Sequence, residues 1–444
     1  MPGIEGKIAE SGPTRKKSLG GAFFWLSAFY AVYCLRPEDW VPGLSYVPMA
    51  KITGILAILG LFSSLGKTKR GFKDMPTEAR YLLIMMAVLG IGAALSPISR
   101  MHAVMATLEF SKVYVAWALT FLLITTIPRL ERIIFIQAAS VGVICAIAIV
   151  KGHSVPRLDG VLGGIYGNPN DLAFAIVLSL PFSLALLVKA KGMLRKGAWL
   201  FSMLIMLMAL FLTASRAGFI TLVISGAVCL WHFGIKGRRP KVIVGAVMIV
   251  GLLLLLAGGR LKDRFFAISG DVQNQVDQSA YGSYEERRFL ILKSLEGIEH
   301  HPLLGVGVHG FPPYSTKWKE VHNSYLQIAV EGGIPVLILY LMFISRGFKN
   351  LRKLRRMRDL DSETVLLAGA LHSSLIGFLV GAFFAPEAYQ FFPYFAVAYT
   401  SVLFAIVRER ENPSLPTADA PGRTRDVTEI YANNRRPNVL TPVR

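Results

Sequence analysis

Long apolar stretches recur along the whole chain and are separated by shorter polar segments. Their lengths approach the ~20 residues that an α-helix needs to cross a ~30 Å hydrocarbon core. The pattern predicts twelve membrane-spanning helices, with boundaries accurate to a few residues and the number to one or two. They are residues 20–35, 50–66, 79–96, 103–127, 130–150, 171–188, 197–213, 217–234, 241–257, 323–345, 364–385 and 391–407.

The polar segments divide the chain into an ordered series of parts. Residues 1–19 precede the first predicted helix, nine helices occupy 20–257, and three more occupy 323–407. Between them lies the longest polar segment, 258–322, which we expect to be a loop containing short helices. The tail at 408–444 is rich in Pro, Asn, Thr and Arg and is expected to be disordered. The prediction is an all-α polytopic integral membrane protein.

Composition strengthens this interpretation. Hydrophobic residues make up 53% of the 444 residues and charged residues 17%, against about 25% charged in soluble domains. The mean hydropathy is +0.49. These values exclude a cytosolic enzyme, a disulfide-stapled secreted domain and a disordered regulator. Cys34, Cys145 and Cys229 all fall within or at the ends of predicted helices, so no disulfide is expected.

The formal charge of +20 is explained by topology. If the N-terminus is cytoplasmic and the helices alternate, the inward segments hold 33 of the 48 Lys and Arg and 13 of the 28 Asp and Glu, and 33 − 13 = +20. These inward segments are 1–19, 67–78 with Arg80, 128–132, 189–196, 236–241, 346–363 and the tail from 408. Such asymmetry is the positive-inside rule, so it predicts cytoplasmic termini and gives no reason to expect a nucleic-acid partner. Within the fourth predicted helix, Glu109 and Lys112 are three residues apart and should pair.

Polar chemistry concentrates in the long outer loop, which holds four of the eight histidines. Ser283 and Glu286 have the spacing of a capping box, which predicts a helix from Ser283 towards Gly297. Arg287 and Arg288 follow, and adjacent residues point about 100° apart on a helix, so one of the two should face any given pocket. Two solvated surface charges are the plain alternative.

Other polar residues lie where the chain leaves or enters the membrane on the outer side. Arg216 is the only charged residue of the short turn 213–218. The alternative to a functional role is that its side chain simply extends to the membrane–water interface. His322 and Tyr325 lie at the start of the tenth predicted helix, where a histidine is more often a capping or packing residue. Asn168 and Asn170 lie directly before the sixth predicted helix, and the simplest interpretation is that they form a turn and an N-cap.

A metal site is not expected. His300 and His301 are adjacent, and neighbouring residues on a regular helix cannot both face one ion. No acidic or cysteine partner has a spacing typical of a metal site.

Several of these fragments, taken in order, resemble the O-antigen ligase and polymerase superfamily of bacterial envelope glycosyltransferases. They are residues 167–170, Ser215 with Arg216, an arginine opening the outer-loop helix, residues 301–307, residues 322–326 and residues 331–333. Each fragment alone is weak evidence, but their shared order on the predicted outer face is fairly specific.

The resemblance implies a function. Members of the superfamily transfer a glycan from a polyprenyl diphosphate carrier to an acceptor at the periplasmic face of the inner membrane. It implies an undecaprenyl-diphosphate-linked donor, a lipid A–core acceptor, membrane lipids as surroundings, and no metal or other cofactor. Arg216 with Arg287 or Arg288 would stabilise the diphosphate leaving group, and His322 would act as general base. Asn168, Asn170 and Tyr325 would contact the glycan or the phosphates.

Alternative functions stay open at this point. A polysaccharide polymerase or a protein O-glycosylation ligase would use the same donor and much the same residues, and residues 36–40 resemble a subgroup of O-glycosylation or exopolysaccharide ligases. A glycolipid transporter would need polar residues through the bundle, yet the predicted helices are nearly uncharged.

Overall fold

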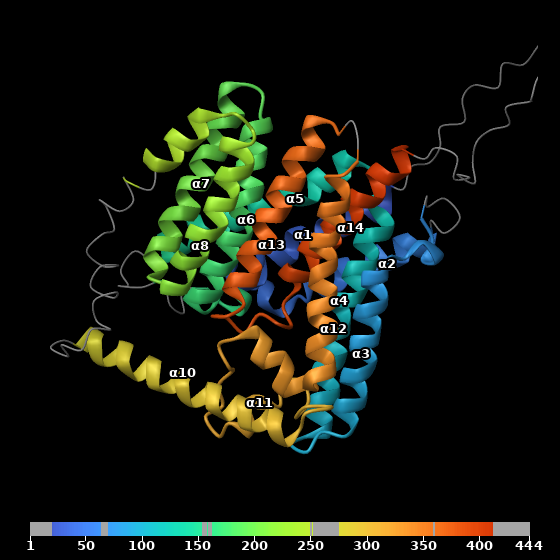
Figure 1. Cartoon of the computed structure of the whole chain (residues 1–444), viewed down its shortest axis with the longest axis vertical. Helices are drawn as coiled ribbons and strands as arrows, with labels where there is room; N and C mark the ends of the chain where they lie inside the picture. The colour runs from blue at the N-terminus through green and yellow to red at the C-terminus, as the bar shows by residue number, and fades with distance from the viewer. Residues whose placement is uncertain are drawn as a thin grey trace, which may run out of the picture.

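The computed structural model describes residues 20–63, 70–152, 158, 162–248, 251, 275–357 and 360–411, with the backbone alone at 275–283. The described part of the chain is helical and contains no strand (Figure 1). Its α-helices are α1 (Gly20–Leu35), α2 (Met49–Ser63), α3 (Thr77–Ala94), α4 (Arg100–Leu123), α5 (Ile127–Lys151), α6 (Pro169–Lys189), α7 (Met193–Thr213), α8 (Arg216–Cys229), α10 (Gln275–His300), α11 (Phe311–Tyr314), α12 (Ser324–Leu354), α13 (Ser362–Gly381) and α14 (Phe391–Glu411).

Nine helices among the described residues are long and apolar enough to cross a membrane. They confirm a multi-pass membrane protein. Helices α1 and α2 coincide with the first two predicted spans but have 16 and 15 residues. Of the ninth predicted span, 241–257, the structure describes residues 241–248 and 251, and segments 1–19 and 412–444 lie outside the described residues. The number twelve therefore stays a prediction.

Helices α6 and α14 are the most buried of the spans, whereas α7 and α8 expose much of their surface. For α14, the burial follows from its large aromatic side chains. Tyr394, Phe395 and Tyr399 of α14 are fully buried, and Tyr399 donates a hydrogen bond of 2.9 Å to Gln137 of α5. Aromatic residues that satisfy their hydroxyls internally can occupy such a centre. The core is thus organised around α14.

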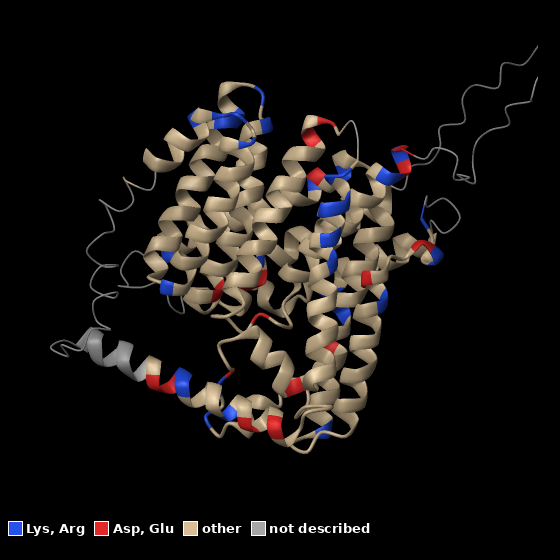
Figure 2. Ribbon diagram, viewed as in Figure 1, with Lys and Arg blue, Asp and Glu red and all other residues tan. Residues whose placement is uncertain are grey.

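Basic side chains gather at one end of the bundle (Figure 2). Lys189 at the end of α6 pairs with Glu131 of α5 and with Glu363 of α13, and Arg70 pairs with Glu409 of α14 at 2.6 Å. We call this the basic end. These paired residues belong to segments that the charge count predicts to be inward. Elsewhere, Glu109 and Lys112 form the predicted pair on the exposed face of α4.

Helix α10 crosses the opposite end of the bundle, which we call the loop end (Figure 1). Its Leu290 packs with Val306, Phe311, Val321 and Val330 in a small apolar cluster separate from the main core. The predicted helix start at Ser283 is wrong, because α10 begins at Gln275. Residues 275–282 continue the helix in the N-terminal direction, so the capping-box spacing falls inside a longer helix.

Helix α12 is broken at Gly333, whose φ is +79°. The backbone groups freed by the break are bonded by the segment before α11. The Val306 amide donates to the Val330 carbonyl at 2.9 Å, the Gly307 amide to the Glu331 carbonyl at 3.0 Å, and the Ile334 amide to the Pro302 carbonyl at 2.8 Å. Irregular backbone within a membrane protein is tolerated where protein groups bond it in this way. The break brings residues 302–320 against α12.

Candidate functional site

Arg216 stands at the first position of α8, directly after a tight turn. Helix α7 ends at Thr213, Ala214 adopts φ +48°, and Ser215 caps α8 by accepting a 3.1 Å hydrogen bond from the Gly218 amide. The first turn of a helix carries partial positive charge and exposed amide donors. A half-buried guanidinium at this position adds a full positive charge, so the N-terminus of α8 favours an anion.

Asn168 and Asn170 shape this region through hydrogen bonds within the protein. The Asn168 side chain caps α6 by accepting from the Asn170 amide at 2.9 Å. The Asn170 side-chain oxygen accepts from the Ser215 hydroxyl at 2.7 Å. The two asparagines therefore connect the starts of α6 and α8 next to Arg216.

Arg287 is the arginine of α10 that lies near Arg216. It is half-buried, and its pKa is lowered mainly by burial and then by the positive charge of Arg216. Neither guanidinium forms an ion pair or hydrogen bond with a described residue. Two such cations kept close together without a carboxylate partner raise each other's electrostatic energy, and an anion bound between them would relieve it.

Arg288 has a different environment. Its side chain is 64% exposed and its nearest acidic partner is Glu285, at 3.9 Å. The two adjacent arginines diverge as helix geometry predicts.

His322 precedes the first turn of α12. Its Nδ1 atom is buried and has no hydrogen-bond partner among the described residues. The pKa of His322 is lowered to about 4, chiefly by burial and next by the charge of Arg287. The imidazole is therefore neutral at pH 7 and able to accept a proton. Arg216, Arg287 and His322 come from three separate elements and meet at the loop end.

Tyr325, expected from the resemblance to contact the substrate, makes two contacts within the protein. Its hydroxyl donates to the Leu379 carbonyl of α13 at 2.9 Å, and its ring lies 4.8 Å from that of Phe383. This interaction ties α12 to the end of α13.

A pair of neighbouring carboxylates at the loop end, the half-buried Asp171 and the buried Glu387, was not predicted from the sequence. Asp171 follows Asn170 on α6, and Glu387 lies between α13 and α14, with its amide donating to Ser324 at 2.9 Å. The pKa of Glu387 is raised by burial and then by the neighbouring Asp171. Two carboxylates this close share a proton more readily than they carry two charges. One sign of this pair was present in the sequence: Glu387 is the only acidic residue in the otherwise uncharged segment 384–389.

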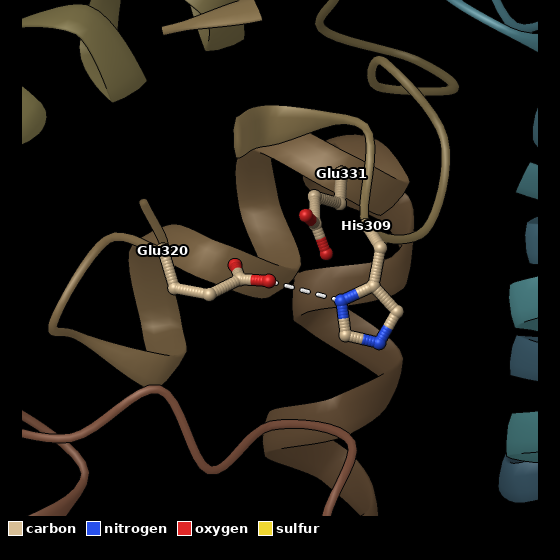
Figure 3. A group of neighbouring side chains, drawn as sticks. All are labelled: His309, Glu320 and Glu331. Carbon is tan, nitrogen blue, oxygen red and sulfur yellow. Dashed lines mark hydrogen bonds and ion pairs between the residues drawn. The ribbon is translucent and has the colours of Figure 1, made fainter. Parts of the chain in front are cut away.

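A second cluster missed by the sequence consists of His309, Glu320 and Glu331 (Figure 3). The His309 ring bonds to Glu320 at 2.9 Å, and Glu331 is completely buried on α12. Within the described part of the chain, this is the group whose donor atoms could share a metal ion. The histidines weighed from the sequence lie elsewhere: His300 is exposed and His301 packs edge-on against Tyr314.

A groove of about 890 Å³ runs between α5 and α7, with Arg132, Lys191 and Arg195 along it. These residues belong to the basic end. The groove is therefore remote from Arg216, which lies at the far end of α7.

Parts of this chain, including part of the site just described, are similar to known proteins. Residues 201–341 match the family model described as O-antigen ligase. The resemblance to the O-antigen ligase and polymerase superfamily is confirmed. A curated relative, the exopolysaccharide production protein ExoQ of Rhizobium meliloti (strain 1021), is 26% identical over 273 residues. That match covers 54% of this chain and 60% of the relative's length.

The matched O-antigen ligase segment contains Arg216, Arg287 and His322, together with Glu320 and Glu331. Asn168, Asn170 and Glu387 lie outside it. The comparisons support a membrane enzyme of polysaccharide assembly, of the ligase or polymerase kind.

Proposed function

We propose that the protein is an O-antigen ligase. It transfers a glycan from undecaprenyl diphosphate to the lipid A–core of lipopolysaccharide, at the periplasmic face of the inner membrane. The observation that carries this proposal is the proximity of Arg216 and Arg287, which form no ion pair with a carboxylate of the described residues, beside the neutral His322.

The two arginines suit a diphosphate leaving group. Negative charge develops on the diphosphate as the glycosidic bond breaks, and a planar guanidinium can hold two phosphate oxygens at once. Charge stabilisation of this kind is commonly the largest contribution to catalysis. Arginine side chains can supply it without a metal at the reacting atoms, so the transfer step is proposed to be metal-independent.

His322 is suited to act as general base towards the acceptor hydroxyl. The imidazole is neutral in the free protein because burial and Arg287 lower its pKa to about 4. A bound diphosphate would offset the charge of Arg287 and raise that pKa towards neutrality, where a base transfers protons most effectively. Direct attack of the hydroxyl would then invert the anomeric carbon.

Membrane orientation follows from the charge distribution. The basic end is proposed to face the cytoplasm, and the loop end the periplasm. The undecaprenyl chain would lie against the apolar helices, with its diphosphate at the start of α8.

A second candidate is polymerisation of an exopolysaccharide. The name of the relative favours it, since that protein is described as an exopolysaccharide production protein. The same arginines and histidine would act on the same kind of donor. Only the acceptor differs, being a second carrier-linked glycan in place of lipid A–core.

Transfer by the purified protein tests the proposal. The reaction contains an undecaprenyl-diphosphate glycan, a lipid A–core acceptor and no added divalent metal. Arg216→Ala and His322→Ala should each reduce transfer by about 100-fold or more, whereas Arg288→Ala should stay within about twofold of wild type.

The products separate the alternatives. A longer glycan on the carrier, with the acceptor unchanged, would identify a polymerase. Wild-type rates in both variants would contradict the assigned roles, and a well-folded wild type that transfers nothing would remove the transferase proposal for these substrates.

A further inference from the structure

His309, Glu320 and Glu331 converge from three parts of the chain (Figure 3). His309 follows the glycine turn at 305–307, Glu320 lies eleven residues later, and Glu331 projects from α12 just before its break at Gly333. One donor atom from each residue lies within 4.8 Å of the others. The cluster thus joins one imidazole and two carboxylates.

Glu331 is the unusual member of the cluster. It is 0% exposed, one carboxylate oxygen accepts a 3.3 Å hydrogen bond from the Phe311 amide, and the other is buried with no hydrogen-bond partner in the described part of the chain. No Lys or Arg forms an ion pair with Glu331 or Glu320 among the described residues. Burial of a carboxylate is costly unless a cation or several donors compensate. The Glu331 carboxylate points towards the space shared with His309 and Glu320 (Figure 3).

We propose that these three residues bind one divalent metal ion, with Zn²⁺ the best match. Zinc accepts imidazole nitrogen and carboxylate oxygen together, whereas calcium and magnesium prefer oxygen alone. In tetrahedral coordination, two ligands each about 2.0–2.2 Å from zinc lie about 3.3–3.6 Å apart. Donor atoms that now lie as much as 4.8 Å apart would move together by about 1 Å, and the 2.9 Å pair of His309 and Glu320 would widen slightly.

Surrounding residues already orient the ligands. Gln327 of α12 donates to the second oxygen of Glu320 at 3.3 Å, which leaves the first oxygen directed at His309. The ring of Tyr389 lies 5.5 Å from that of His309 and covers it from the turn before α14. Outer residues that hold the ligands in place are typical of metal sites in proteins.

The ion would fasten the loop 309–320 to α12. That loop contains three residues with positive φ, His309, Thr316 and Trp318, a conformation that non-glycine residues adopt only when the surroundings hold them. The site is distinct from the arginines of the proposed transfer reaction. Its role is to hold the segment that leads into His322.

Metal content and cobalt spectra test the site without any glycan donor. The full-length protein, carrying an affinity tag without histidine, is purified, incubated with Zn²⁺ and freed of loosely bound metal. Elemental analysis should find about one zinc per chain. His309→Ala and Glu320→Gln should lose this zinc, and both residues are partly exposed, so folding should persist. His300→Ala, an exposed histidine of the neighbouring helix, is the matched control and should retain it.

Cobalt substitution gives a second readout. Co²⁺ bound at this site should produce visible d–d absorption that is absent from His309→Ala and present in His300→Ala. The alternative is a protonated His309 that links the two carboxylates without metal. In that case wild type would hold no stoichiometric zinc and show no cobalt spectrum, and the proposal would be overturned. Zinc retained equally by all variants would also overturn it.

Discussion

Arg287 and Arg288 are adjacent in sequence, yet one is half-buried near Arg216 and the other is exposed to solvent. This contrast allows a matched test of guanidinium geometry. Arg287→Lys keeps the positive charge but removes the planar pair of donors, so transfer should fall by about tenfold to 100-fold. Arg288→Lys should leave transfer unchanged. Initial rates with a fixed donor would measure both variants, and equal rates would argue against phosphate contact by Arg287.

His322 offers a pH test at the same scale. Its pKa is lowered to about 4 by burial and by Arg287, so the ring is protonated only below about pH 4 in the free protein. Arg287→Gln removes a positive charge and should raise this pKa, because protonation of His322 no longer meets repulsion. Carbon-13 NMR of labelled histidine, assigned with His322→Gln, would follow the titration.

A diphosphate should act in the same direction. Farnesyl diphosphate added to the wild type would offset the arginine charge and raise the pKa of His322. A titration near pH 4 in all three samples would show that Arg287 and the diphosphate have no electrostatic contact with the histidine.

At the scale of elements, the break in α12 positions both the candidate metal ligands and the turn at 302–307. Gly333 has φ +79°, and an added Cβ would lie 2.5 Å from the backbone of Leu303. Gly333→Ala should therefore destabilise the protein by about 3 kcal/mol or more. Gly90→Ala is the control, because that helical position of α3 has no neighbour within 4 Å of an added Cβ. Thermal unfolding in detergent would compare the two variants. Similar midpoints would show that the backbone at Gly333 accepts an alanine without strain.

The elements also show what the sequence could predict. Hydropathy located the spans, since an apolar stretch near membrane thickness has few other stable structures. The resemblance implied a common site for Arg216, His322 and either Arg287 or Arg288, and sequence alone left the choice between the two arginines open. The Asp171–Glu387 pair and the His309 cluster were missed because they join residues far apart in sequence, and spacing carries no information about such contacts. The start of α10 was missed because a local capping signal was outweighed by the longer helix.

At the scale of the whole molecule, the two ends differ in both charge and chemistry. The basic end holds interlocking ion pairs such as those of Lys189 and Arg70, and the loop end holds the candidate site. Positive residues flanking membrane helices favour the cytoplasmic side because their translocation is opposed. If the basic end faces the cytoplasm, Arg216 and His322 face the periplasm, where a lipid-linked glycan would meet its acceptor.

Cysteine accessibility tests this orientation directly. Cys34, Cys145 and Cys229 are free and buried, so they should give little background labelling. Met193, at the basic end, and Trp318, at the loop end, are 87% and 77% exposed and tolerate substitution with little loss of packing. In bacteria with a permeabilised outer membrane, an impermeant maleimide should label Trp318→Cys, and should label Met193→Cys only after lysis. The reverse pattern would place the candidate site in the cytoplasm, where a periplasmic acceptor could not reach it.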